Sequence, residues 1–163
     1  MKLRHIPLIS ALVCLAACGF QLRGTNLQAL QESPVQVKSK GAGTLANEVK
    51  KQLLDAGIRT VKSESDAEYV ITLSNEYFER SVLSVSPDTG KVEEYELSYR
   101  AYLTVRDPDG QIVLKSEPVT AERSYTFDEG SVLGKFEEEN VLRRDIAKQA
   151  ASTVLRRLQS LTQ

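Results

Sequence analysis

A strict alternation of apolar and polar side chains marks the middle of the chain as a half-buried β-strand. Every second position from 95 to 105 is apolar, and these residues are Tyr95, Leu97, Tyr99, Ala101, Leu103 and Val105. The positions between them are Glu94, Glu96, Ser98, Arg100, Tyr102 and Thr104. Because successive side chains of a strand point to opposite faces, the pattern predicts one buried face and one wet face.

Residues 68–85 form a second β segment that is rich in Val, Ile, Thr, Tyr and Phe. These residue types are enriched in strands, so the segment predicts one long strand. The polar pair Asn75 and Glu76 interrupts it and indicates a β-bulge. Turn-forming residues at 86–90 then predict a hairpin to the alternating strand.

A third β segment covers residues 112–127 and follows a second turn sequence at 107–110. Its Pro118 has no N–H to donate, which predicts an edge position or a bulge at that point. Strands joined by such short turns pair antiparallel, so the three segments predict two consecutive hairpins.

Helical periodicity flanks this β region on both sides. After a short strand at 35–38, helical spacing begins at Thr44, a good N-cap, and ends at Gly57, a good C-cap. The apolar stripe consists of Leu45, Val49, Leu53 and Ala56. A second helix is predicted from about Gly130 to Leu158, where apolar residues recur every four positions. They are Leu142, Ile146, Ala150, Val154 and Leu158.

The predicted fold class is α+β, with the element order β-α-β-β-β-α. The strand at 35–38 and the three longer segments make a mostly antiparallel four-stranded sheet, and residues 58–61 add a short extended piece. Each helix has one apolar stripe, so we expect a two-layer sandwich with both helices packed on one face of the sheet. Residues 35–163 are thus predicted to form a single α+β domain.

The first residues of the chain have the pattern of an export signal. A basic start precedes an apolar run at 6–15, which is too short for a membrane-spanning helix of about twenty residues. Small residues then lead to Cys18, and the sequence Leu-Ala-Ala-Cys at 15–18 is similar to the bacterial lipobox. We therefore expect residues 1–17 to be a signal peptide that is removed, and the Cys18 thiol to carry the lipid.

The position after the cysteine bears on the location of the protein. Lipoproteins held in the inner membrane typically carry Asp there, whereas this chain has Gly19. The expected location is the outer membrane, lipid-anchored and on the periplasmic side. Residues 18–34 would then be the lipidated N-terminus and a linker to the domain.

Loss of the signal peptide restricts the chemistry of the mature protein. Removing Lys2 and Arg4 changes the formal net charge from −1 to −3, which disfavours nucleic acid as a partner. The single histidine, His5, and Cys14 are removed with it, and Cys18 is blocked by lipid. This excludes a zinc site, a Cys–His nucleophile and a Ser–His–Asp triad. The chain shows no motif for carboxylate or Ser–Lys catalysis, so we expect no enzyme activity, no metal and no cofactor beyond the covalent lipid.

Several local patterns occur in order along the mature chain. They are Cys-Gly-Phe-Gln-Leu-Arg-Gly at 18–24, Glu-Tyr-Glu-Leu at 94–97, Arg-Ser-Tyr-Thr-Phe-Asp at 123–128, Val-Leu-Gly-Lys at 132–135 and Ala-Ala-Ser-Thr-Val-Leu-Arg-Arg-Leu at 150–158. In this order and spacing they resemble LptE, the family of lipopolysaccharide-assembly lipoproteins. The resemblance covers essentially the whole mature chain.

The resemblance implies a function. Proteins of this family sit as a plug inside a large outer-membrane β-barrel, LptD, and the pair inserts lipopolysaccharide into the outer leaflet. An LptE-like chain is expected to complex with LptD, to assist assembly of the barrel and to bind lipopolysaccharide itself, without enzymatic activity. The expected partners are LptD, lipopolysaccharide and, through the lipid anchor, the membrane.

Three cations are candidates for contact with lipopolysaccharide, whose phosphates Lys or Arg can bind. Lys135 matches the basic position of the family in the Val-Leu-Gly-Lys segment, and Arg123 lies near the end of the last strand. Lys91 lies in the first hairpin turn, where family members can carry a basic residue at the tip. Here the tip is Pro-Asp-Thr-Gly at 87–90, and the charge follows slightly later.

Plainer interpretations remain open for the same residues. Arg123 also fits a structural ion pair, and Lys135 a solvated lysine at a helix start. The acidic run 137–139 fits favourable interaction with a helix N-terminus, and the pair 143–144 a solvated helix face. Core packing is the plainer interpretation for Tyr95, Tyr99 and Tyr125. The alternative function is another periplasm-facing outer-membrane lipoprotein adaptor, such as a pilotin or an assembly-machine accessory.

Overall fold

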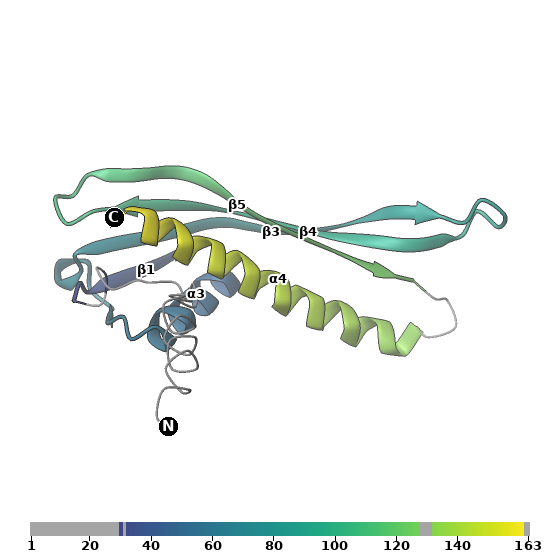
Figure 1. The fold of residues 1–163 in the computed structure, drawn as a ribbon, viewed down its shortest axis with the longest axis horizontal. Coiled ribbons are helices and arrows are strands. Elements are labelled where there is room, and N and C mark those ends of the chain that lie inside the picture. The colour runs from purple at the N-terminus through teal and green to yellow at the C-terminus, as the bar shows by residue number, and fades with distance from the viewer. Residues whose placement is uncertain (1–29, 31, 128–131, 162–163) are drawn as a thin grey trace, which may run out of the picture.

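The computed structural model describes residues 30, 32–127 and 132–161, and these form one sheet with two α-helices (Figure 1). The predicted signal peptide and Cys18 lie outside the described residues. The strands are β1 (Val35–Lys40), β2 (Thr60–Val61), β3 (Tyr69–Val85), β4 (Val92–Arg106) and β5 (Ile112–Thr126). The helices are α3 (Gly43–Asp55) and α4 (Val132–Leu161), and a 3₁₀ turn covers Glu64–Asp66.

The α+β class is confirmed, but the strand count and one pairing differ from the prediction. The sheet has five strands in the order β2-β1-β3-β4-β5, because the short extended piece pairs as β2. Strands β3, β4 and β5 are antiparallel neighbours, as predicted. Strand β1 is instead parallel to both β2 and β3, since the chain returns through α3, the crossover that parallel strands require.

Both helices lie on the same side of the sheet, which confirms the two-layer arrangement (Figure 1). The apolar positions of β4 face them, and all of these from Leu97 to Val105 are at most 2% exposed. The helices contribute Leu45, Val49, Leu53, Ile146, Ala150, Val154 and Leu158 to the same core. The other face of the sheet carries the polar positions of the alternation. No helix in the described part of the chain has the length and apolar content needed to cross a membrane.

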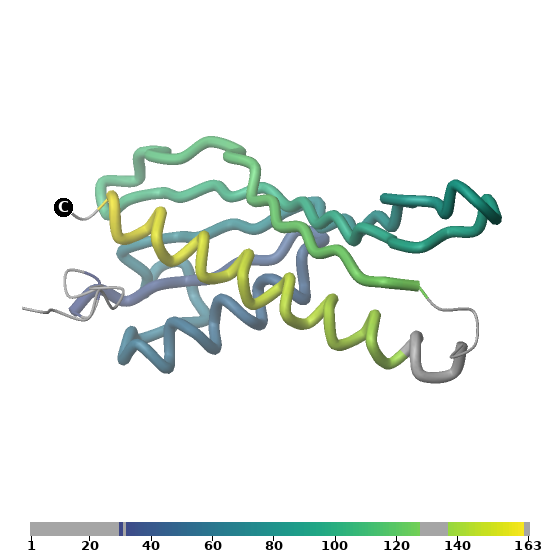
Figure 2. Tube along the Cα trace, turned by 45° about the vertical axis from the view of Figure 1, so that its right-hand side comes forward, coloured from purple at the N-terminus to yellow at the C-terminus, as the bar shows by residue number. Residues whose placement is uncertain are grey.

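The β3–β4 hairpin extends beyond the core. Figure 2 shows its turn projecting well past α3, while α4 runs diagonally along the sheet. At this end of the hairpin, β3 carries Val82, Leu83 and Val85, which are 52%, 50% and 53% exposed. We call the end of the molecule that contains the β3–β4 turn, the end of β5 and the start of α4 the distal end.

The predicted bulge in β3 brings a carboxylate to the start of α3. The β3–β4 register shifts between Ser74 and Tyr77, and Asn75 adopts a positive φ of 53°. Glu76, the next residue, accepts hydrogen bonds from the backbone N–H groups of Thr44 and Leu45 at 3.0 and 3.2 Å. These groups belong to the first helical turn, whose N–H groups have no partner within the helix. Glu76 therefore caps α3 from another element, where a negative charge also favours the helix dipole.

The prediction that Thr44 is the N-cap is wrong. The N-cap position is Ala42, which has no side-chain acceptor, and Thr44 lies inside the helix. The distant carboxylate of Glu76 replaces the local hydroxyl. The C-terminal prediction is confirmed, because Gly57 has a φ of 77° and its N–H bonds to the carbonyl of Leu54. The N–H of Ile58 bonds to the carbonyl of Leu53, which completes a Schellman motif.

The hydroxyl of Tyr99 completes the contact around Glu76. It donates to the Glu76 carboxylate at 3.0 Å, and the ring is 2% exposed. Burial raises the pKa of Tyr99, and the neighbouring Glu76 charge raises it further. The hydroxyl thus stays protonated and remains a donor. This hydrogen bond links β4, which carries Tyr99, to β3, which carries Glu76.

Strand β5 is an edge strand with a bulge, as Pro118 predicted. Ser116 has a positive φ of 53°, and the β4–β5 register shifts at this point. The guanidinium of Arg157 on α4 donates to the carbonyl of Pro118 at 2.9 Å. A bulge, a proline and a capped carbonyl together make this stretch a poor template for a further strand.

We predict that Glu76→Gln lowers the free energy of unfolding by about 1–2 kcal/mol, because the variant loses the charge and one acceptor of the helix cap. Urea denaturation of the mature domain measures it. The matched control is Glu79→Gln on the same strand, an exposed residue that should change stability by less than about 0.5 kcal/mol. Equal effects of the two variants would show that Glu76 does not stabilise α3 in this way.

Candidate functional site

The three predicted cations lie toward the distal end. Lys91 closes the β3–β4 turn, where the N–H of Ser86 donates to its carbonyl at 2.7 Å. Arg123 lies in the last part of β5, and Lys135 is in the first turn of α4. The Lys135 side chain lies outside the described residues, as does Cys18. Figure 1 shows that the hairpin turn, the end of β5 and the start of α4 face the same end of the molecule.

Lys91 and Arg123 do not form one compact cluster. Arg123 is paired across the sheet with Leu97, which lies six residues along β4 from Lys91. At about 3.3 Å per residue, this places their backbones roughly 20 Å apart. A single phosphate cannot contact both, so any ligand that uses both cations must be an extended molecule.

The structural ion pair suggested for Arg123 is not found among the described residues. Its side chain is exposed and donates to the carbonyl of Glu122 at 3.3 Å. It lies on the same sheet face as Ala121 and Tyr125, which are both buried, but its own side chain stays exposed at the edge strand. Its guanidinium therefore keeps donors available for another group.

Glu139 joins α4 to the hairpin. Its carboxylate accepts two hydrogen bonds from Arg143, at 2.7 and 3.0 Å, and pairs with Arg80 of β3 at 3.2 Å. The hydroxyl of Tyr125 on β5 donates to it at 3.4 Å. We call these four residues the Glu139 clamp. Its members come from two strands and one helix, so it fixes the first half of α4 against the distal part of the sheet.

Aromatic rings support both arginines of the clamp. The guanidinium carbon of Arg80 lies 4.8 Å from the ring centroid of Tyr95, and that of Arg143 lies 4.9 Å from the ring of Phe78. Such cation–π contacts each contribute about 0.5–1 kcal/mol at exposed sites. Tyr95 and Phe78 also pack against the core, so packing holds the arginines in place.

The clamp corrects two predictions about α4. Arg143 is not part of a solvated face, whereas its neighbour Arg144 is exposed. Glu139 lies beyond the first turn of a helix that begins at Val132, where the helix dipole has little effect. The interaction that holds Glu139 is instead its pairing with Arg143 and Arg80. The packing interpretation of Tyr99 and Tyr125 is confirmed, since they are 2% and 8% exposed.

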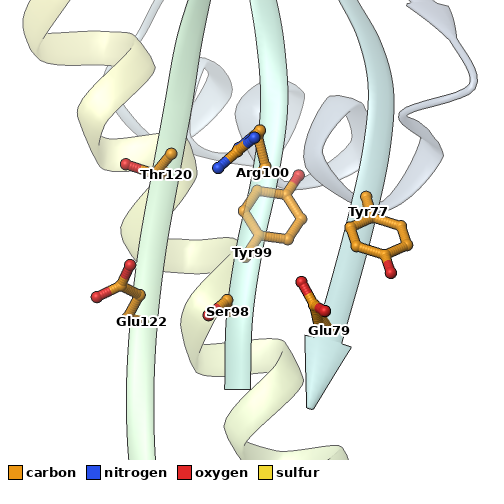
Figure 3. A pocket seen from close by; sticks show the side chains of 7 residues that line it. All are labelled: Tyr77, Glu79, Ser98, Tyr99, Arg100, Thr120 and Glu122. Atoms are coloured by element: carbon orange, nitrogen blue, oxygen red, sulfur yellow. The ribbon is translucent and has the colours of Figure 1, made fainter. Parts of the chain in front are cut away.

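A shallow hollow lies on the open face of the sheet, opposite the helices (Figure 3). It encloses about 160 Å³ and is lined by Tyr77, Glu79, Ser98, Tyr99, Arg100, Thr120 and Glu122. The cross-strand register explains its composition. Tyr77, Arg100 and Thr120 lie opposite one another on β3, β4 and β5, and the next row is Glu79, Ser98 and Glu122.

The charges in this hollow have no partners within the described part of the chain. Figure 3 shows the Arg100 side chain turned toward Thr120, with Glu79 and Glu122 on the flanking strands. None of these three charged groups forms an ion pair with a described residue. By contrast, at the other end of the same face Glu64 pairs with both Lys38 and Arg106, which lower its pKa through hydrogen bonds.

The helix layer has a second depression on its outer side, between α3 and α4. It encloses about 500 Å³ and is lined by Thr44, Asn47, Glu48, Lys51, Arg144, Ala147 and Lys148. Lys148 pairs with Asp145 at 3.6 Å, so part of its positive charge is already compensated. Nothing in its shape selects a ligand, because it is open to solvent along both helices.

Sequence reasoning did not single out the clamp or the hollow. The alternation in β4 correctly placed Arg100 on the wet face, but it could not identify its neighbours. Those depend on the register of β3 after its bulge and of β5 after its own. For Glu139 the spacing to Arg143 was a usable signal, since residues four apart on a helix are neighbours.

Comparison with known proteins gives a consistent result. The family model described as lipopolysaccharide-assembly, LptE, matches residues 28–158. The chain is 29% identical to the LPS-assembly lipoprotein LptE of Photorhabdus laumondii over 162 residues, which cover 97% of this chain and 87% of that protein. It is also 29% identical to the LptE of Pectobacterium atrosepticum over 163 residues, with coverages of 97% and 86%.

Solved structures share the fold. Rare lipoprotein B from Shewanella oneidensis aligns with a TM-score of 0.65 and 28% identity, over 77% of this chain and 95% of that one. The solution structure of an uncharacterized lipoprotein B from Nitrosomonas europaea aligns with a TM-score of 0.69, over 88% and 92% of the two chains. Its identity is 24%, so this second match concerns the fold alone.

We predict that Glu139→Gln destabilises the domain by about 1–2 kcal/mol at neutral pH, because Arg80 and Arg143 lose their shared anion. Burial tends to raise the pKa of Glu139, but hydrogen bonding and charge from Arg143 and Arg80 outweigh it, so that the pKa lies below its usual value of 4.5. A lowered folded-state pKa means that the stabilisation is present at neutral pH and is lost as the pH falls through that pKa.

Urea titrations of wild type and variant from pH 7 to pH 3 test this dependence on pH. The difference between the two proteins should shrink as the pH falls. Glu138→Gln is the matched control, since its exposed side chain forms no ion pair with a described residue. A difference that stays constant across the pH range would rule out a role for the Glu139 charge.

Proposed function

The chain belongs to the LptE family of lipopolysaccharide-assembly proteins, and on this premise we propose that it is an outer-membrane lipoprotein that complexes with and plugs the LptD β-barrel. In this role it assists assembly of the barrel and the insertion of lipopolysaccharide into the outer leaflet. The observation that carries the proposal is the family match over residues 28–158, which includes every described strand and nearly all of α4.

The surface of the domain supports a role as a plug. The lumen of a large outer-membrane barrel is polar, so a protein inside it needs a polar surface on a firmly packed domain. The open face of the sheet is polar along β4, and the opposite face is closed by the helices. The long hairpin stabilised by the Glu139 clamp adds reach beyond the core.

Direct binding of lipopolysaccharide is the second part of the proposal. Its phosphates would be held by the cations of the distal end, Lys91, Arg123 and Lys135. The separation of roughly 20 Å between Lys91 and Arg123 suits a large headgroup better than a small anion. Exposed apolar side chains on the neighbouring part of β3 support contact with a molecule that is also partly apolar.

The remaining parts of the proposal concern the anchor and the absence of catalysis. Lipid on Cys18 would hold the domain at the outer membrane on its periplasmic side, and this rests on the sequence around residues 15–19. The role is binding rather than catalysis, because the expected mature chain has no histidine and no thiol available for chemistry.

Affinity purification of the tagged lipoprotein from detergent-solubilised outer membranes tests the main proposal. We expect one large β-barrel protein at near-equal stoichiometry, identified by mass spectrometry. Cys18→Ala is the matched variant, which should take up no clickable fatty acid and leave the membrane fraction. Recovery of the lipoprotein alone, or with a secretin or another machine, would overturn the plug hypothesis in favour of a different adaptor role.

We predict that the double variant Lys91→Glu with Lys135→Glu binds purified lipopolysaccharide about tenfold more weakly, through loss of charge-assisted contacts to phosphate. Microscale thermophoresis at fixed ionic strength measures it. The control Lys50→Glu with Lys51→Glu makes the same change in net charge on the exposed surface of α3. Equal weakening by both pairs would indicate a nonspecific charge effect, and unchanged binding would refute these two residues as contacts.

A further inference from the structure

The open face of the sheet has an unassigned hollow around Arg100. We infer that this hollow is the surface through which the domain docks on the inner wall of its barrel partner, and that it is not a lipopolysaccharide site. The inference rests on the proposed function and adds to it which face of the sheet meets the partner. Its anchors would be Arg100 and Tyr77.

The hollow has a definite charge pattern across three strands. Glu79 on β3 and Glu122 on β5 flank Ser98 of β4. Arg100 lies two residues further along β4, in the neighbouring row, so the hollow holds one cation and two carboxylates on three adjacent strands. Within the described residues none of the three has an ion-pair partner, although Arg100 lies only one row away from both carboxylates. Charges held apart in this way are available to groups on another molecule. A complementary wall would present a carboxylate to Arg100 and cations to Glu79 and Glu122.

Tyr77 and Arg100 have the properties of interface anchors. Tyr77 lies opposite Arg100 and is 60% exposed, which is high for a large ring on a paired strand. Tyrosine and arginine are the residue types, with tryptophan, that most often dominate binding energy at protein interfaces. Both stand on paired strands, so little backbone freedom would be lost on docking.

The charge balance favours a protein partner over lipopolysaccharide. Two carboxylates and one guanidinium line the hollow, and Glu94 and Glu96 continue the acidic character along β4 toward the distal end. A phosphorylated headgroup would meet net repulsion here. The cations assigned to that ligand lie elsewhere, in the turn, near the end of β5 and at the start of α4. The molecule therefore offers separate surfaces to its two partners.

The lumen of a transmembrane barrel and this hollow are both lined by polar and charged side chains. Inward-facing residues of a transmembrane barrel strand alternate with lipid-facing ones and are polar or charged. A sheet face with a shallow depression can lie against such a wall. The helix layer is the less suitable side for this contact, because its depression is open along both helices and has no anchor residue comparable to Tyr77.

The first test is charge reversal in the full-length lipidated protein. Arg100→Glu should lower the yield of co-purified barrel by about tenfold relative to wild type. Arg144→Glu, an exposed arginine on the outer side of α4, is the matched control and should retain the barrel. Both variants should unfold at the wild-type urea midpoint and bind purified lipopolysaccharide as wild type does. Wild-type recovery of the barrel by Arg100→Glu would overturn the inference.

The second test identifies what touches the hollow. A photoreactive phenylalanine derivative is placed at Tyr77 or Thr120, and at Lys50 or Gln149 on the helix layer as controls. Irradiation of intact cells should give adducts with the barrel from the first pair only. Adducts of the first pair with lipopolysaccharide or with a second copy of the chain would overturn the inference.

The two proposals fail differently in these experiments. If wild type recovers the barrel but only Lys50 and Gln149 give adducts with it, the docking face is wrong and the proposed function stands. If wild type recovers no barrel at all, the proposed function fails, and the docking inference fails with it.

Discussion

The carboxylate of Glu76 is the contact on which the arrangement of this domain depends. It satisfies two N–H groups at the start of α3 and accepts the hydroxyl of the buried Tyr99, so one side chain links a helix to the two central strands. The bulge at Asn75 makes this possible by turning Glu76 out of the regular alternation of β3. Without it, the N–H group of the buried Leu45 would lose this acceptor, which costs about 1–3 kcal/mol for a buried group.

Strand β3 continues past the bulge and thereby connects the packed half of the molecule to its distal end. In the packed half, apolar stripes of both helices cover one face of the sheet. Further along, the Glu139 clamp and the aromatic rings packed around it hold α4 to β3 and β5. The three surfaces that result differ in chemistry. The distal end carries cations and exposed apolar side chains. The open face carries a hollow whose charges form no ion pair with a described residue, and the helix layer is an ordinary solvated surface. Tyr77 and Arg100, the proposed docking residues, thus stand on paired strands.

Local sequence signals predicted what is determined locally. The alternation in β4 placed Tyr99 in the core and Arg100 on the wet face, and Gly57 ended its helix as expected. These local signals could not predict contacts between residues that lie far apart in the sequence. Glu76 caps a helix whose first turn lies 31 and 32 residues away, so the local Thr44 was chosen wrongly. The hollow and the clamp depend on strand register after two bulges, which no periodicity reveals. Lys91, Arg123 and Lys135 as ligand contacts, and Cys18 as the lipid site, stay predictions.

Electron cryo-microscopy of the complex purified from outer membranes would test the central claim most directly. The account predicts density for the α+β domain inside the wall of one β-barrel, with the open face of its sheet against that wall. A domain bound outside the barrel, or a purified complex without any barrel, would contradict it.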